Sequence, residues 1–229
     1  MKTKRNLIIA STVILAAMVF VGTTLAYFWD EASVTNEFTT AAGVDIDVDE
    51  PNWNREDGED ITPGDVISKD PTLSNLQDDV YARMVMAIVD KDTGEVITDQ
   101  DRLDKIYSML FYSEDVLQPD GSITLPEPMT ADELAVLPRI NPLFVLDDGR
   151  TGEGVYYFNY DGVLTKDDEG IALFTGLVVP TNWTGTDMTE IGNFDLVIKG
   201  QAIQTANIDS AEAAYTALDT EIENAPVEP

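Results

Sequence analysis

Hydrophobic and polar residues alternate in several parts of the chain, and this alternation predicts β-strands. At residues 44–48, Val44, Ile46 and Val48 share one face, and aspartates occupy the other. A strand with one apolar face is half-buried. The longest β-prone run, VYARMVMAIVD at residues 80–90, is apolar on both faces apart from Arg83 and its final aspartate. Such a strand is typical of the centre of a sheet.

The strand pattern returns in the second half of the chain. Residues 154–164, 170–180 and 194–208 are rich in β-branched and aromatic side chains and are bounded by turn residues. Within the last of these runs, Gly200 predicts a bulge or a bend, because a glycine inside a strand often marks one.

Helical spacing separates the two groups of strands. Residues 99–111 place their apolar side chains on one face, with Asp99 or Asp101 as the N-cap. A second helix begins at Thr130, which forms a capping box with Glu133. Near the C-terminus, residues 209–223 predict an amphipathic helix.

These elements predict a mainly β fold, namely one antiparallel β-sandwich with short helical insertions and a C-terminal helix. The expected organisation follows the chain: a signal peptide at 1–26, an N-terminal arm at 27–43, the sandwich at 44–208, and the helix and tail at 209–229.

The first 26 residues predict export. Lys2, Lys4 and Arg5 precede an uncharged apolar run that reaches Ala26. A basic start, an apolar stretch and a small residue at the end are typical of a secretory signal peptide, here cleaved between Ala26 and Tyr27. The alternative is an uncleaved membrane anchor, since about 20 apolar residues span a bilayer. Both interpretations place the rest of the chain outside the cytoplasm, tethered to the membrane until cleavage.

Charge and missing residue types exclude several classes of function. Ten basic and 43 acidic residues follow residue 26, which gives a net charge of −33. A nucleic-acid backbone would be repelled by this charge, so nucleic acid is excluded as a partner. The chain has neither histidine nor cysteine. A histidine-based zinc site, a Ser-His-Asp triad, a Cys-His pair and disulfides are therefore impossible.

Residues 49–60, rich in Pro, Asn, Asp and Gly, predict an acidic loop, which together with Asp47 raises the question of calcium. Carboxylates are suitable Ca²⁺ ligands, although a charge run is usually a solvated face. The run at residues 90–96 resembles the start of a calcium loop, but its glycine comes one position early, which favours a tight turn. We expect no cofactor, with Ca²⁺ as a weak alternative whose candidate ligands are Asp47, Asp49, Glu50, Asp57 and Asp60.

Several segments together resemble one family of exported proteins. Near the N-terminus they are the predicted signal peptide at 1–26, then Tyr27, Phe28 and Asp30, and the Asn-x-Phe at residues 36–38. Further along they are AAGVDIDVD at 41–49, TPGDVISKD at 62–70, DDVYARMVMAIV at 78–89, and the closing runs LFTGLVV at 173–179 and IGNFDLVIKGQAIQTANID at 191–209. In this combination the chain resembles the TasA/camelysin family of Gram-positive bacteria. The resemblance is most specific at the leader, and residues 95–150 do not contribute to it.

The resemblance implies a jelly-roll-like sandwich and processing by a SipW-type signal peptidase. Fibre-forming members of the family are secreted subunits of the biofilm matrix. They polymerise by donor-strand complementation, in which the segment after the signal inserts into the sheet of the next subunit. The implied partners are therefore other copies of the chain, the peptidase, and an accessory matrix protein.

The arm has the side chains that such an exchange needs. Phe28, Val34 and Phe38 fall on one face of an extended strand, and Trp29 falls on the other. Main-chain hydrogen bonds supply affinity in strand addition, and alternate side chains fill pockets. With Tyr27, these four residues are the predicted polymerisation arm. The alternative is that the arm folds back as an edge strand of its own sheet.

The sequence therefore predicts a structural fibre subunit that is not an enzyme. Two alternatives stay open. One is a cell-surface metalloprotease, because camelysin members of the family have been described as such. The other is an acidic cation-binding surface or adhesion module.

Overall fold

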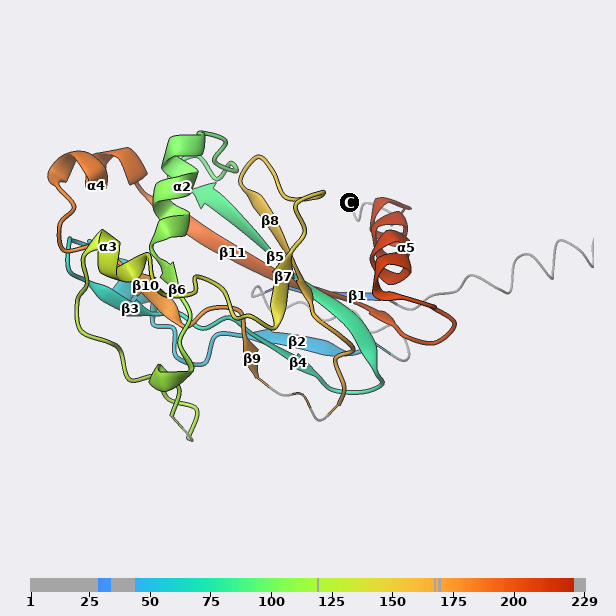
Figure 1. The fold of residues 1–229 in the computed structure, drawn as a ribbon. Helices are drawn as coiled ribbons and strands as arrows, with labels where there is room; N and C mark the ends of the chain where they lie inside the picture. The colour runs from blue at the N-terminus through green and yellow to red at the C-terminus, as the bar shows by residue number, and fades with distance from the viewer. Residues whose placement is uncertain (1–28, 34–43, 119, 167, 169, 225–229) are drawn as a thin grey trace, which may run out of the picture.

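The computed structural model describes residues 29–33, 44–118, 120–166, 168 and 170–224, and for residues 29–33 and 224 it describes the backbone alone. The fold is mainly β, and every strand pair is antiparallel. Short helices and a long C-terminal helix complete it (Figure 1). The predicted fold class is confirmed, while the jelly-roll connectivity stays an expectation of the resemblance.

The strands form three sheets. The largest is five-stranded, in the order β1 (Trp29–Ser33), β11 (Phe194–Gln204), β5 (Val80–Asp90), β8 (Val155–Tyr160) and β7 (Phe144–Leu146). The second has the order β3 (Val66–Ser68), β10 (Gly176–Val178) and β6 (Leu110–Phe111). The third has the order β2 (Ile46–Asp49), β4 (Thr72–Asn75) and β9 (Ile171–Ala172).

The core lies between the five-stranded sheet and the two smaller sheets. Strand β5 is the third of the five strands, and Met84, Met86 and Ile88 on it are fully buried. These side chains belong to one apolar cluster with residues of both small sheets, such as Val48 and Leu177. The apolar character of both faces of β5 thus predicted its central position correctly.

Gly200 does not form the predicted bulge. The register between β11 and β5 runs without interruption from Phe194 opposite Asp90 to Gln204 opposite Val80. A Cβ atom on Gly200 would lie 2.6 Å from Cγ2 of Val48, which is closer than real contacts allow. The glycine therefore lets β2 approach the large sheet closely, which is the other established use of glycine in a strand.

The helices begin at the predicted caps. In α2 (Gln100–Ser108), the Asp99 carboxylate accepts a hydrogen bond from the Arg102 amide at 2.9 Å. In α3 (Ala131–Leu134), Thr130 and Glu133 form the predicted capping box. Helix α4 (Gly185–Ile191) was not predicted, because its seven residues give less than two turns of periodicity. Two short 3-10 helices are η1 (Arg55–Gly58) and η2 (Glu114–Val116).

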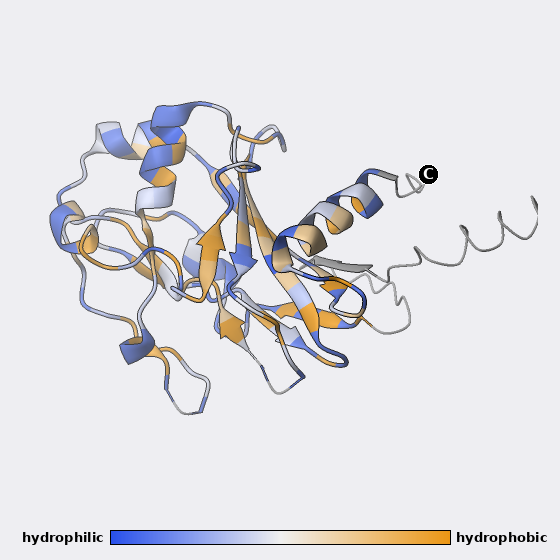
Figure 2. Cartoon of the chain, turned by 45° about the vertical axis from the view of Figure 1, so that its right-hand side comes forward, coloured by the Kyte–Doolittle hydropathy of each residue, from blue (hydrophilic) through white to orange (hydrophobic). Residues whose placement is uncertain are grey.

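Helix α5 (Ala211–Asn224) confirms the predicted C-terminal helix and packs on β11 and β5. Figure 2 shows hydrophobic residues on α5 beside hydrophilic ones. Its buried residues Ala214, Tyr215 and Leu218 form an apolar cluster with Ile203 of β11. Within the described part of the chain, no helix is both long enough and apolar enough to cross a membrane.

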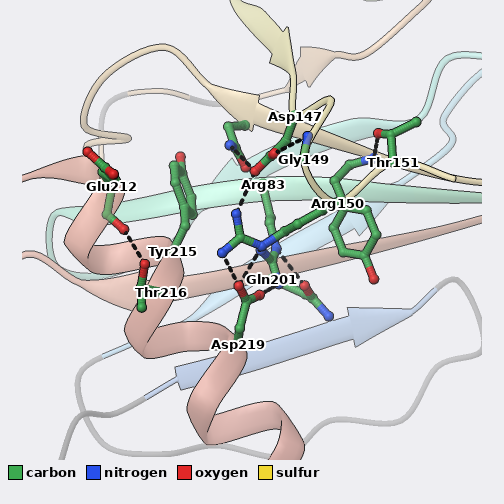
Figure 3. Close-up of polar contacts among 12 residues, drawn as sticks. Arg83, Asp147, Gly149, Arg150, Thr151, Gln201, Glu212, Tyr215, Thr216 and Asp219 are labelled. Carbon is green, nitrogen blue, oxygen red and sulfur yellow. Dashed lines mark hydrogen bonds and ion pairs between the residues drawn. The ribbon is translucent and has the colours of Figure 1, made fainter.

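A polar network also holds α5 in place (Figure 3). The Arg83 side chain of β5 is buried, and it donates from Nε to Oε1 of Gln201 at 2.7 Å and from Nη2 to Oδ1 of Asp219 at 2.6 Å. Arg150 also pairs with Asp219, and it donates from Nη1 to Oδ2 of Asp147 at 2.7 Å. Asp219 of α5 thus bridges two arginines, one of which is buried.

Candidate functional site

Strand β1 forms one edge of the five-stranded sheet. It pairs antiparallel with β11, from Trp29 opposite Ile203 to Ser33 opposite Lys199. In this structure the first part of the arm therefore lies on the sheet of its own chain. The pairing covers five residues of β11, whereas β11 itself has eleven. Within the described residues, the stretch from Phe194 to Ile198 has no strand partner on this edge.

A groove of about 1120 Å³ lies along this unpaired stretch of β11. Residues 194–197 form one wall, and residues of the 50–61 segment contribute to the opposite wall. Apolar side chains from β3, β10, β11, α4 and the 50–61 segment line it, including Ile61, Ile67, Leu177, Ile191, Phe194 and Leu196. A strand edge of this kind beside a partly apolar groove is suited to accept an added strand, because the edge offers main-chain hydrogen bonds and the groove can take alternate side chains.

The groove is less acidic than the rest of the chain. Three basic residues, Arg55, Lys69 and Lys91, line it together with five acidic ones. After residue 26 the whole chain has only ten basic residues against 43 acidic ones. Repulsion of an acidic segment is therefore weaker here than at an average point of the surface.

Arg102 fixes one end of the groove. It donates from Nε to the Ile191 carbonyl at 2.7 Å and from Nη2 to the Asn193 carbonyl at 2.9 Å. Its Nη1 donates to Oδ2 of Asp90 at 2.7 Å. The guanidinium thereby lowers the pKa of Asp90 to about 2. Arg102 thus joins the last residue of β5 to the turn that leads into β11.

Asp70, next to the groove-lining residue Lys69 in sequence, is buried. It accepts hydrogen bonds from the main-chain amide of Asn52 at 3.0 Å and from Nδ2 of Asn52 at 2.7 Å. Burial raises the pKa of Asp70, although both hydrogen bonds act in the opposite direction. The acidic loop predicted from the sequence is therefore fastened to the segment between β3 and β4.

The structure describes one residue of the predicted polymerisation arm. Trp29 is the first residue of β1, described by its backbone. Tyr27, Phe28, Val34 and Phe38 lie outside the described residues, as does the expected cleavage site at Ala26.

The calcium candidates do not form an evident metal site. Glu50 is committed to an ion pair with Lys69 at 2.6 Å, and the Oδ1 atom of Asp49 accepts from the Glu50 amide. Across the described ranges, no group of three or more acidic residues could hold a metal ion. Calcium binding through Asp47, Asp49, Glu50, Asp57 or Asp60 stays a prediction.

Comparison with models of protein families gave a match over the N-terminal part of the chain. Residues 1–101 match the camelysin metallo-endopeptidase family. The resemblance inferred from the sequence is thus confirmed for this part, which includes the leader, the arm, the acidic loop and strands β1 to β5. Searches of curated proteins and of solved structures found no match.

The camelysin description names a metal-dependent peptidase, and the groove does not supply the usual ligands of one. Catalytic zinc is normally held by at least one histidine or cysteine. This chain has neither residue anywhere in its sequence. Carboxylates alone suit Ca²⁺ or Mg²⁺ better than zinc.

Sequence analysis missed the residues that shape the groove. A tryptophan at position 53 inside an acidic loop was a signal of packing, because an aromatic ring contributes nothing to a solvated charge run. Lys69 and Arg102 gave no such signal, since their roles depend on partners 19 and 89 residues away.

Proposed function

We propose that this chain is an exported structural subunit that assembles into extracellular fibres by donating its N-terminal arm to β11 of a neighbouring copy. The observation that carries the proposal is the position of β1. It is an edge strand that ends at Ser33, opposite Lys199, and among the described residues the adjoining stretch of β11, which borders the groove, has no partner on this edge. The match of residues 1–101 supports the family resemblance on which this proposal draws.

The hydrogen-bonded pairing of β1 with β11 can form within a free chain or between two chains of a fibre. An arm that pairs with its own β11 can pair in the same register with the β11 of another chain, because the two contacts are chemically identical. Each subunit would then donate at one end and accept at the other. Such a head-to-tail contact does not close on itself, so it generates an open filament.

Continuing the observed register predicts where the remaining anchors go. Ser33 lies opposite Lys199, so Val34 would lie opposite Ile198 and Phe38 opposite Phe194. Burying a large apolar side chain contributes about 1.5–3 kcal/mol. Two such anchors in the groove would thus favour a fully inserted arm by about 3–6 kcal/mol before the cost of ordering it.

Cross-linking gives a direct test, because the chain has no cysteine of its own. Ser33→Cys and Lys199→Cys are placed in separate chains, which are mixed after removal of the leader. Opposite residues of an antiparallel pair lie about 4.5–5.5 Å apart at Cα, within the range that a disulfide can bridge. We expect a disulfide between the two chains and fibres visible by electron microscopy.

The control pairs Ser33→Cys with Val145→Cys on β7, the opposite edge of the sheet, and should give no cross-link. Deletion of residues 27–38 should abolish the fibres. Persistent fibres of the same width after this deletion would exclude the mechanism. A third sample, in which one chain carries both cysteines, completes the test: a disulfide within this chain and none between the two single variants would show that the arm stays on its own sheet.

Export completes the proposed function. A SipW-type signal peptidase would release Tyr27 as the new N-terminus, and the mature chain would act at the cell surface or in the matrix, with an accessory matrix protein as a further partner. The charge of −33 per subunit opposes assembly. Salt and divalent ions should therefore accelerate assembly, since screening shortens the range of repulsion to about 8 Å at physiological ionic strength. Acid should accelerate it as well, because it neutralises carboxylates and so lowers the charge.

A cell-surface protease is the second candidate, favoured by the family description. Chelator-sensitive cleavage of casein by the purified mature chain would establish it. The absence of histidine and cysteine favours the fibre subunit.

A further inference from the structure

Residues 50–61, here called the rim loop, line the groove on the side facing β11. Glu50, Trp53, Gly58 and Ile61 all contribute to this wall. The opposite wall is a strand that is bonded to β5 along its whole length. Of the two walls, the rim loop is therefore the one that can move without breaking a sheet.

One end of the rim loop is held by a buried ion pair. Nζ of Lys69 lies 2.6 Å from Oε1 of Glu50, and the two side chains are only 8% and 7% exposed. The same ammonium lies 4.4 Å from the centroid of the Trp53 ring, a cation–π distance. Lys69 thus fixes both the start of the loop and the position of its aromatic ring.

The middle of the rim loop rests on Trp53. A Cβ atom on Gly58 would lie 2.5 Å from Cη2 of Trp53, so the ring packs directly against the backbone of η1. Within the loop, the side chain of Asn54 caps η1, and Arg55 lies 3.9 Å from Glu59 with both side chains exposed. Outside the loop, η1 also contacts β3. Trp53 is the side chain that joins η1 to the buried anchor at Lys69.

We propose that the rim loop is a clamp over the acceptor groove, latched by Trp53 between Lys69 and Gly58. The clamp closes over an inserted arm of another copy and sets how long that arm stays bound. This inference rests on the proposed fibre function. In this proposal, Trp53 and Gly58 determine how long the donated arm stays bound. The hydrogen bonds to β11 determine the register in which it binds.

The physical reason is kinetic. An inserted strand lies between β11 and the rim loop, so it leaves only when the loop swings out or the ladder breaks. Most differences in affinity among variants of one interface appear in the dissociation rate. Loosening the latch should therefore accelerate exchange of subunits much more than it changes the structure of the fibre.

The test measures subunit exchange between two preparations of mature fibres. Each chain carries one engineered cysteine at Val136, which is 80% exposed, and is labelled with a donor or an acceptor fluorophore. Energy transfer after mixing reports exchange. Gly58→Ala is the main variant, because the methyl group must displace the Trp53 ring. Gly152→Ala is the matched control, since a Cβ there meets nothing within 4 Å.

We expect Gly58→Ala to exchange about tenfold faster than the wild type, which corresponds to about 1.4 kcal/mol, and Gly152→Ala to exchange at the wild-type rate. Trp53→Leu removes the latch by another route and should give the same acceleration. It replaces Gly58→Ala as the test if that variant does not fold. A urea midpoint for each variant separates exchange from general loss of stability.

Two failures are distinguishable. If wild-type chains form fibres and the Ser33→Cys and Lys199→Cys chains cross-link, but the latch variants exchange at the wild-type rate, the clamp is refuted and the fibre function stands. If wild-type chains form no fibres and the two cysteine variants do not cross-link, the fibre function fails and the clamp fails with it.

Discussion

The contact between Gly200 and Val48 allows a quantitative prediction for Gly200→Ala. The added Cβ would lie 2.6 Å from Cγ2 of Val48 and 3.1 Å from Cδ1 of Ile46. The added Cβ would also lie 3.4 Å from Cδ1 of Leu73, and all three neighbouring side chains are buried. The methyl group therefore enters a filled core between β11 and β2, not an empty site.

Two opposing effects determine the size of the change. Forcing an extra carbon into a packed core costs typically 1–3 kcal/mol. Replacing glycine by alanine where the backbone permits it stabilises by about 0.4–1 kcal/mol through the unfolded state. Packing is the larger effect, so Gly200→Ala should lower the free energy of unfolding by about 1–2 kcal/mol.

Urea denaturation of the mature chain at low ionic strength measures this, with Gly152→Ala as the control. Val48→Ala alone should also destabilise, by about 1.5 kcal/mol for two methyl groups. In the double variant the new methyl occupies the vacated space, so the combined loss should be smaller than the sum by at least about 0.5 kcal/mol. Strictly additive losses would show that Gly200 is required for another reason, and the close-approach argument would be wrong.

Three further predictions concern the polar contacts that support the sheet. Asp219→Ala leaves the buried Arg83 without its carboxylate and should cost about 3 kcal/mol in urea denaturation, whereas Asp209→Ala, in the turn before α5, should cost less than about 0.5 kcal/mol. Asp90→Asn should lower the urea midpoint at pH 7. The pKa of Asp90 falls from 3.8 to about 2 on folding because of Arg102, so its contribution is present above pH 3.8 and is lost as the pH falls through 2, where variant and wild type should converge. Tyr215→Phe removes a buried hydroxyl that donates to a main-chain carbonyl 2.9 Å away and should cost about 1 kcal/mol, measured in the same way.

Sequence periodicity located the elements whose pattern is long and local. The strand predicted at residues 80–90 is β5 with the same bounds, and the capping box at Thr130 is present as expected. These features depend on side chains within one strand or one turn, so neighbouring residues suffice to specify them. Helix α4 and the short strand β4 lacked such a signal because each is too short for a period to appear.

The groove could not be predicted from the sequence, because it is formed by contacts between segments that are far apart in the chain. The sequence indicated an acidic loop at residues 49–60, and its composition suggested a solvated or cation-binding surface. Folding instead buries Glu50 against Lys69 and inserts Trp53 behind η1. An ion pair of this kind is decided by which segments the sheets bring together, and the charge of either residue does not reveal it.

By itself the sequence determined the mainly antiparallel fold, the exclusion of histidine and cysteine chemistry, and a family resemblance that the match over residues 1–101 confirmed, and it predicted an export signal. Tertiary structure decided that β1 pairs with residues 199–203 of β11, that Gly200 makes room for β2, and that the rim loop lines one groove with a stretch of β11 that has no partner on that edge among the described residues. The reason for this division is physical. Alternation and capping arise between neighbours in the chain, whereas strand register, close approach and grooves arise between segments that meet only after the chain has folded.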